Sequence, residues 1–349
     1  MLNNGFSLPG EWENQSAVLI TWPHNHSDWA ESLSEIESFY IELSSAITQY
    51  EKMIIISYDL QLQERIESLL VKNNIPLEQV IFHIAKTNDT WTRDYGPIYL
   101  TRNSKILLLD FQFNGWGDKY VAVMDNKITS DLLIKQTIQT HESRKIDFVL
   151  EGGSIESDGN GSLLTTSSCL LSRKRNPTFN QEDINSFLQT TLGVKQVLWL
   201  SQGYLAGDDT DSHIDVLARF VGNNTIVYIK CEDKTDEHFT SSKAMEDELK
   251  TFRNCENEPY NLVPLPFPRP KFDRDNRRLA ASYANFLIIN GAILVPTYND
   301  PSDDLALKVL QSCFKDRDII GIPCSATIEQ NGSLHCLTMQ LPAGILDKF

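Results

Sequence analysis

The six cysteines of this sequence include no C-x-x-C pair, and that absence excludes the common structural zinc sites. They are scattered from position 169 onward in a chain of 349 residues, at Cys169, Cys231, Cys255, Cys313, Cys324 and Cys336. In a long chain whose first residues do not resemble a secretion signal, this usage favours reduced thiols over a disulfide framework. We therefore expect free thiols and a cytoplasmic protein.

Long apolar runs and an excess of basic residues are also missing. No segment reaches the ~20 consecutive apolar residues that a membrane helix needs, and residues 1–15 combine Glu11 and Glu13 with no basic residue. Acidic side chains outnumber basic ones by 47 to 31, which gives a formal net charge of −16. Nucleic acid and anionic membranes attract basic clusters, so we expect neither as a partner. The charge suits a small cationic substrate.

No Pro-, Gly- or Ser-rich linker and no low-complexity segment divides the chain, so a single domain over residues 1–349 is predicted. A helix followed by a strand recurs instead. Apolar residues spaced by three and four predict a helix at 33–47, and a buried strand follows at 53–56. The same succession is predicted at 62–70 with 80–82, at 180–192 with 197–200, and at 300–310 with 319–322, with further strands at 106–109, 226–229 and 286–289. The pattern indicates a strand-rich α/β protein.

Polar residues gather in four clusters at the ends of these strand-like runs. The clusters are Asn88–Pro97, Glu151–Ser154, Gly207–Asp215 and Gly332–Thr338. Asp94, Glu151, His213 and Cys336 follow one another at intervals of roughly sixty residues or twice that, as a radial array of similar units would give. We interpret the clusters as parts of one site.

Each cluster also has an ordinary structural explanation. Asp94 could pair with Arg93 in a surface turn before Gly-Pro, and Glu151 could be a strand-end carboxylate before a tight Gly-Gly turn. His213 could be incidental in a solvated acidic turn. If the segment around Ile214 is extended, however, His213 and Asp215 share one face, which suits a general base beside a cation-binding carboxylate.

Two metal sites were weighed against this interpretation. Asp209-x-Asp211 begins like a calcium loop, but Phe220 stands where the loop needs its final glutamate. A zinc hydrolase site from His24 and His26 with His213 and Asp215 is a rival from another mechanistic class, although no H-E-x-x-H helix accompanies it.

Cys336 follows Gly332-Ser333-Leu334-His335 close to the end of the chain. A buried, inert thiol is the usual fate of a cysteine. With a histidine and carboxylates elsewhere in the sequence, Cys336 also fits the pattern of a cysteine nucleophile. Several carboxylates around a thiol make chemical sense if the electrophile is itself a cation.

Taken in order, these segments resemble the agmatine deiminases of the guanidine-modifying superfamily, which also includes arginine deiminases and bacterial-type peptidylarginine deiminases. The resemblance covers nearly the whole chain. Its motifs are Pro9–Glu13, Thr21–His24, Trp91–Pro97, Glu151–Gly153, Arg173–Pro177, Asp209–Asp215, Ala281–Phe286, Asn290–Ala292 and His335–Gln340. The sequence departs from the family just before His335. The family usually has a glycine-rich run and an asparagine there, and this chain has Glu329–Leu334 instead.

The resemblance implies a pentein fold, an α/β propeller of five β-β-α-β-type units with pseudo-fivefold symmetry around a central channel. It also implies roles for individual residues. By motif, Cys336 is the nucleophile, His213 the general acid and base, and Glu151 its carboxylate partner. Asp94 and Asp215 would grip the guanidinium. Asp209 and Trp91 are further expected substrate contacts.

The function implied is hydrolysis of agmatine to N-carbamoylputrescine and ammonia through a covalent amidino-cysteine, as in polyamine synthesis, with no metal or organic cofactor. Two aligned carboxylates would hold the planar cation and orient its central carbon for attack. The alternatives are deimination of arginine in peptides, amidino transfer to an amine, and non-catalytic binding of a guanidinium. A homodimer is a further expectation.

Overall fold

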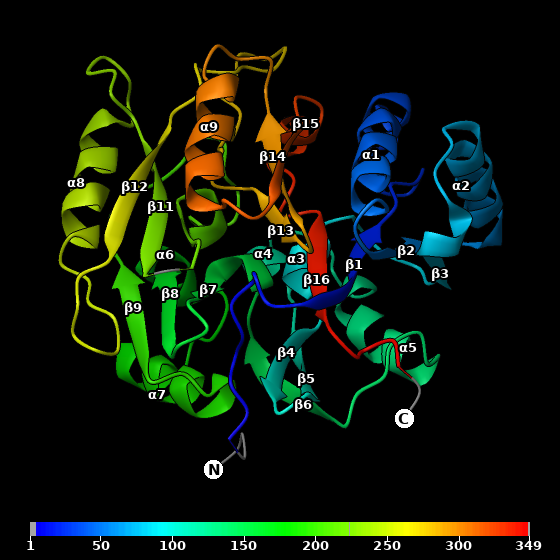
Figure 1. Ribbon diagram of the computed structural model, residues 1–349, viewed down its shortest axis with the longest axis horizontal. Coiled ribbons are helices and arrows are strands. Elements are labelled where there is room, and N and C mark those ends of the chain that lie inside the picture. Colours follow the sequence, from blue (N-terminus) through cyan, green and yellow to red (C-terminus); the bar gives the residue numbers. More distant parts are fainter. Residues whose placement is uncertain (1–4, 223, 348–349) are drawn as a thin grey trace.

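The computed structural model describes residues 5–222 and 224–347 and shows a mixed α/β fold built from small sheets (Figure 1). The strands of these described ranges form five sheets. In sheet order they are β16 (Thr338–Pro342), β1 (Gln15–Thr21), β2 (Lys52–Ser57) and β3 (Val80–Ile84); β4 (Ile98–Arg102), β5 (Lys105–Gln112) and β6 (Glu142–Val149); β7 (Ile155–Ser157), β8 (Ser162–Thr166) and β9 (Gln196–Leu200); β10 (Ala218–Phe220), β11 (Thr225–Lys230) and β12 (Asn261–Pro266); and β13 (Leu287–Ile289), β14 (Ala292–Thr297) and β15 (Asp318–Pro323).

Every sheet repeats one pattern of strand directions. One strand in each, namely β1, β5, β8, β11 or β14, has an antiparallel neighbour on one side and a parallel neighbour on the other. A helical connection leads from that strand to its parallel neighbour, because parallel strands cannot be joined by a tight turn. The first sheet is closed by the last strand, since β1 pairs with β16.

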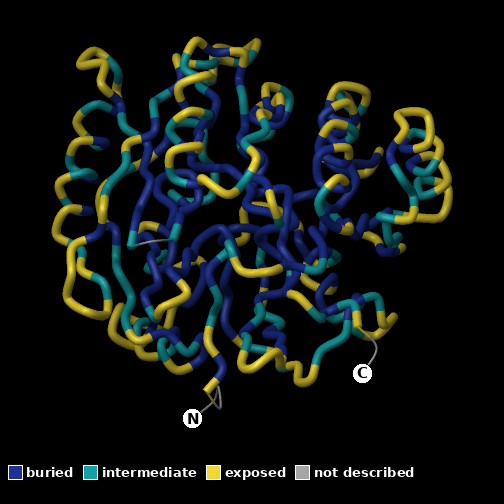
Figure 2. The backbone as a smooth tube through the Cα atoms, in the orientation of Figure 1, coloured by how far each residue is buried: buried dark blue, intermediate teal, exposed yellow. Residues whose placement is uncertain are grey.

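The longer helices lie at the periphery, and the buried backbone is concentrated between them and in the middle of the molecule (Figures 1 and 2). The α-helices are α1 (Leu33–Ile47), α2 (Leu60–Lys72), α3 (Thr92–Tyr95), α4 (Gly115–Asp118), α5 (Ile128–Ile134), α6 (Ser167–Leu170), α7 (Gln181–Leu192), α8 (Phe239–Leu249) and α9 (Asp303–Cys313). Short 3-10 turns cover Leu77–Gln79, Asp125–Lys127, Gly152–Ser154, Ile214–Val216 and Thr327–Gln330. No helix within the described ranges has the length and apolarity that a membrane crossing requires.

The predicted helix–strand successions are confirmed, with one shift. The helix expected at 180–192 begins after Asn180, whose side chain accepts from the backbone of Asp183 while Asp183 accepts in return, and it ends at Gly193 in the left-handed conformation. The helix expected to open at Asp300 and Pro301 begins at Asp303 instead. The carboxylate of Asp303 accepts from the Asp300 backbone N–H, so the residues between them form a turn before the helix.

Candidate active site

Three of the predicted site residues converge on Gly153, in the 3-10 turn Gly152–Ser154. Asp94 comes from α3, whereas His213 and Asp215 come from the segment around the 3-10 turn Ile214–Val216. A Cβ built on Gly153 would lie 2.7 Å from His213 Nδ1, 2.8 Å from Asp94 Oδ1 and 3.0 Å from Asp215 Oδ2. Glycine therefore lets the backbone approach three polar groups that surround one small space.

The environment of His213 and Asp215 corrects two expectations. Ile214–Val216 is a 3-10 turn, so the extended segment assumed for these residues is wrong, although both side chains still face Gly153. The surface-turn alternative for Asp94 is also wrong, because Asp94 is only 3 % exposed. Its neighbour Arg93 is buried too and contacts Glu11.

The pKa values of Asp94 and Asp215 are shifted in opposite directions. Asp94 accepts hydrogen bonds from the Gly153 backbone N–H at 2.9 Å and from Trp116 Nε1 at 2.8 Å. Burial raises the pKa of Asp94 well above its ordinary value, and the nearby carboxylates of Asp215 and Glu151 raise it further. Burial acts in the same direction on Asp215, but the hydrogen bond and charge of His335 prevail and hold the pKa of Asp215 below its ordinary value.

His213 lacks a hydrogen-bond partner at both ring nitrogens within the described part of the chain, although its side chain is fully buried. Burial lowers the pKa of His213 to about 3, so the ring is neutral near pH 7. One side-chain atom that could ligate a metal from each of His213, Glu151 and Cys169 lies within 4.8 Å of the other two. An unpaired buried imidazole is costly, which indicates that these nitrogens serve a ligand.

Arg175 forms a buried ion pair with the carboxylate of Glu151. The Arg175 Nε lies 2.8 and 3.0 Å from the two carboxylate oxygens, and its Nη1 donates to Asp211 at 2.6 Å. Burial raises the pKa of Glu151, while the charge of Arg175 opposes that rise. Arg175 thus fixes the carboxylate that lies beside His213.

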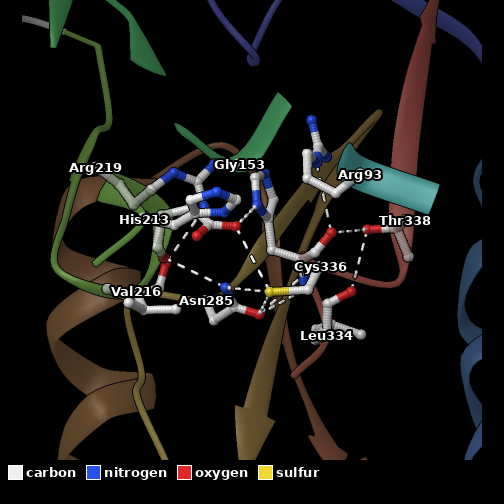
Figure 3. Close-up of polar contacts among 12 residues, drawn as sticks. Arg93, Gly153, His213, Val216, Arg219, Asn285, Leu334, Cys336 and Thr338 are labelled. Carbon is white, nitrogen blue, oxygen red and sulfur yellow. Dashed lines mark hydrogen bonds and ion pairs between the residues drawn. The ribbon is translucent and has the colours of Figure 1, made fainter. Parts of the chain in front are cut away.

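Cys336 lies in the loop that leads into β16, at the edge of the same space (Figure 3). Its Sγ is 3.7 Å from Asp215 Oδ2, and Asn285 Nδ2 donates to it at 3.3 Å. Burial, followed by the carboxylates of Asp215 and Asp94, raises the pKa of the Cys336 thiol well above its ordinary value. This environment favours the neutral thiol, and a bound cation would favour the thiolate.

A cavity opens onto Cys336 and is lined mainly by acidic and aromatic side chains. Its acidic members are Asp28, Asp89, Asp94, Asp208 and Asp209, and its aromatic members are Trp91, Trp116 and Tyr120. Burial raises the pKa of Asp89 to about 7 and that of Asp208 to about 6. Asp209 lies farther out on this wall, where it accepts from Tyr120 Oη at 2.5 Å. Trp91 packs under Gly332, whose Cβ would lie 2.1 Å from the indole ring.

The metal sites weighed from the sequence are not assembled. His24 contacts Thr87, and the rings of His24 and His26 pack at a tilt against Tyr58; neither histidine belongs to the group of possible metal ligands that contains His213. Asp211 is paired with Arg175. Among the residues that the structure describes, the His/Cys/Asp/Glu group close enough to hold an ion is Glu151, Cys169 and His213, and Arg175 already occupies its carboxylate.

Sequence reasoning missed several residues that build this site. Asn285, His335 and Glu11 lie within the motifs quoted above, but nothing in their spacing indicated contact with Asp215 or Cys336. Trp116 had no sequence signal. It follows Gly115 and precedes Gly117, and all three residues have positive φ, which directs the indole N–H at Asp94.

A family model described as Porphyromonas-type peptidyl-arginine deiminase matches residues 7–342. The chain belongs to this family. An agmatine deiminase of Pseudomonas putida is 30% identical, with 98% of this chain and 97% of that protein covered. An agmatine deiminase of C. jejuni, solved as a cysteine-to-serine variant with substrate bound, is 38% identical with a TM-score of 0.89 and 97% of both chains covered. A Porphyromonas gingivalis structure provisionally described as an arginine deiminase is 45% identical with a TM-score of 0.90, covering 97% of this chain and 98% of that one.

Proposed function

We propose that this family member hydrolyses agmatine to N-carbamoylputrescine and ammonia, with Cys336 as nucleophile. The observation that carries the proposal is the convergence of Asp94, Asp215 and His213 on the space beside Gly153. Buried carboxylates and an imidazole without a partner in the described structure are stable together only if a cation completes them. A guanidinium has the charge, planarity and N–H groups for that role.

In this mechanism Asp94 and Asp215 bind the guanidinium N–H groups and hold the central carbon beside the Cys336 sulfur. His213 takes the thiol proton, Sγ bonds to the carbon, and the same proton leaves on the departing ammonia. His213 then deprotonates a water that attacks the amidino-cysteine, and the C–S bond breaks to release the ureido product and restore the thiol. Glu151 stabilises the imidazolium that forms on His213. No step needs a metal or an organic cofactor.

The acidic lining of the outer part of the cavity favours agmatine over free arginine and over arginine in a peptide. Asp28, Asp89, Asp208 and Asp209 line the cavity beyond Asp94, and they suit the second cation at the far end of agmatine. Free arginine would place a carboxylate among these groups, and arginine in a peptide would bring an uncharged backbone. The agmatine deiminase names of the relatives reported above agree with this preference.

The proposal includes the arrangement of the chain. We propose a single catalytic domain over residues 1–349, with five β-β-α-β-type units around a pseudo-fivefold axis and the site in the central channel. The repeated strand pattern and the helical connection in each sheet support it. A cytoplasmic location accords with the free thiols at all six cysteines. The homodimer stays a prediction, which sedimentation would decide.

One assay tests the function. The purified protein is incubated separately with agmatine, free arginine and an arginine-containing peptide, and both ureido product and ammonia are measured. Product from agmatine well above product from the other two is expected. Equal or greater product from the peptide would assign the protein to peptidylarginine deimination, and a requirement for an added amine would indicate amidino transfer. Binding without product by the wild-type protein would leave only guanidinium binding.

A further inference from the structure

His335 is adjacent to the nucleophile in sequence, yet its side chain does not line the substrate cavity. The ring is fully buried and lies between two carboxylates. Its Nδ1 is 2.8 Å from Asp215 Oδ2, and its Nε2 is 2.9 Å from Glu11 Oε1. One imidazole therefore bridges a residue of the site and a residue from the start of the chain.

The bridge uses only one of the two carboxylate oxygens of Asp215. Oδ2 is occupied by His335, whereas Oδ1 is buried and has no hydrogen-bond partner in the described ranges. A neutral imidazole donates only one hydrogen bond, so two carboxylate contacts require one more proton within the bridge. The bridge thus fixes the carboxylate plane and leaves Oδ1 available to a ligand.

The far end of the bridge is firmly anchored. Glu11 accepts from Gln340 Nε2 at 2.9 Å, contacts Arg93 Nη1 at 3.3 Å and pairs with Arg219. Arg219 is itself fully buried and bonded to Glu156. His335 is consequently held by groups that do not move independently, and it transmits their position to Asp215.

Because of the bridge, the two carboxylates proposed to bind the guanidinium, Asp94 and Asp215, have different surroundings. Both are buried and both face Gly153, but only Asp215 contacts His335, and only its pKa lies below the ordinary value. The charged and titratable groups that act on Asp215 are His335, His213, Arg219, Asp94, Asp208 and Cys336. Those facing His335 are Asp215, Glu11, Arg93 and Arg219.

We propose that His335 is a positioning residue whose hydrogen bond to Oδ2 of Asp215 fixes that carboxylate and aims its free Oδ1 at the guanidinium, with Glu11 as the fixed end of the bridge. This inference rests on the proposed function, because Asp215 must be a substrate carboxylate. It predicts that cutting the Asp215 end of the bridge weakens substrate binding, whereas cutting the Glu11 end has a smaller effect.

Two substitutions separate the ends of the bridge. In His335→Asn the amide nitrogen lies near the position of Nδ1, so the contact with Asp215 is retained and that with Glu11 is lost. In His335→Gln the amide nitrogen lies near Nε2, so the Glu11 contact is retained and the Asp215 contact is lost. Both are made in a Cys336→Ser background, and the Kd for agmatine is measured by calorimetry from about pH 6 to about pH 9.

We expect His335→Gln to weaken binding about tenfold or more and to move the loss of affinity on acidification to higher pH. His335→Asn should stay within about threefold of the parent, because its amide retains the contact with Asp215 and only the hydrogen bond to Glu11 is lost. The matched control is His83→Gln. His83 is equally buried and bonded at both nitrogens, to Thr137 and Asp131, but lies in β3 away from the site. It should lower the melting temperature and leave the Kd and its pH profile unchanged.

Equal effects of His335→Gln and His335→Asn, or a pH profile like that of the parent, would overturn the inference. If His335→Gln does not fold, Glu11→Gln decides, because it loosens the bridge while leaving His335 on Asp215. Its Kd should then stay within about threefold of the parent, as in His335→Asn, and a loss of tenfold or more would overturn the inference. If Cys336→Ser itself does not bind agmatine, the proposed function fails first, and the role of His335 fails with it.

Discussion

The Nδ1 of His213 lies 3.6 Å from Oδ1 of Asp94, too far for a hydrogen bond, in a fully buried environment. Two buried polar groups at this distance, with no hydrogen bond between them, can both bond to a ligand that lies beside them. A guanidinium between Asp94 and Asp215 would be such a ligand, and the imidazole would then lie beside the bond that breaks.

Cys336→Ser should abolish turnover and retain agmatine binding, because a hydroxyl is a far weaker nucleophile than a thiolate. In the wild-type protein, agmatine should protect Cys336 from alkylation. Cys255 is exposed and provides an internal control, since its alkylation should be unaffected. Mass spectrometry of the two peptides measures both. Turnover close to the wild-type rate in Cys336→Ser would rule out the covalent mechanism.

Asp94→Asn and Asp215→Asn should each reduce kcat/KM by about tenfold or more, because each removes a charge-assisted hydrogen bond to the guanidinium. The double variant should lose much less than the product of the two effects, since one misaligned guanidinium is already unreactive. Asp131→Asn, which removes the carboxylate that faces His83, is the control and should change stability only. Normal turnover with a lowered melting temperature in both single variants would show that Asp94 and Asp215 stabilise the fold and do not bind the guanidinium.

Binding of agmatine to Cys336→Ser should release protons. The raised pKa of Asp94 favours its protonated form, and a cation bound beside it would displace that proton. The sign follows directly: affinity falls as pH falls, because protonated Asp94 competes with the guanidinium. Calorimetry in two buffers of different ionisation enthalpy measures the number released. Adding Asp94→Asn should reduce that number, and an unchanged number would show that Asp94 is ionised before binding.

Gly153→Ala should block substrate binding with little effect on the fold. The added methyl would lie 2.7 Å from His213 Nδ1 and 2.8 Å from Asp94 Oδ1, in the space assigned to the guanidinium. Gly321→Ala is a matched control, because its Cβ would also meet a neighbour at 3.0 Å, the Thr297 methyl in β14 away from the site. We expect about a hundredfold loss of kcat/KM for Gly153→Ala only. Full activity of that variant would move the guanidinium site elsewhere.

Dialysis against a metal chelator should leave activity unchanged, since the donor group Glu151, Cys169 and His213 already has Arg175 on its carboxylate. Activity is compared before and after dialysis, with zinc added back in a parallel sample. A loss on dialysis that zinc restores would revive a metal-dependent mechanism.

Local patterns predicted the elements, and motif order predicted the site residues, but neither predicted how the residues meet. The 3.6-residue periodicity of 33–47 and the cap at Asn180 depend on neighbours in sequence, so they are visible in the sequence. The contact of Asn285 with Cys336, the His335 bridge to Glu11 and the 3-10 turn after His213 depend on tertiary packing. Nothing in the spacing of these residues encodes them.

The pairing of β1 with β16 has a consequence for synthesis of the chain. Ile20 faces Thr338 in that pairing, so the first sheet cannot be completed until the chain has been synthesised through β16. Because contacts between such distant segments form late in folding, the nucleophile joins a preassembled set of acidic groups. A chain that stops before Cys336 therefore lacks both the thiol and β16, and it holds the carboxylates and His213 without their nucleophile.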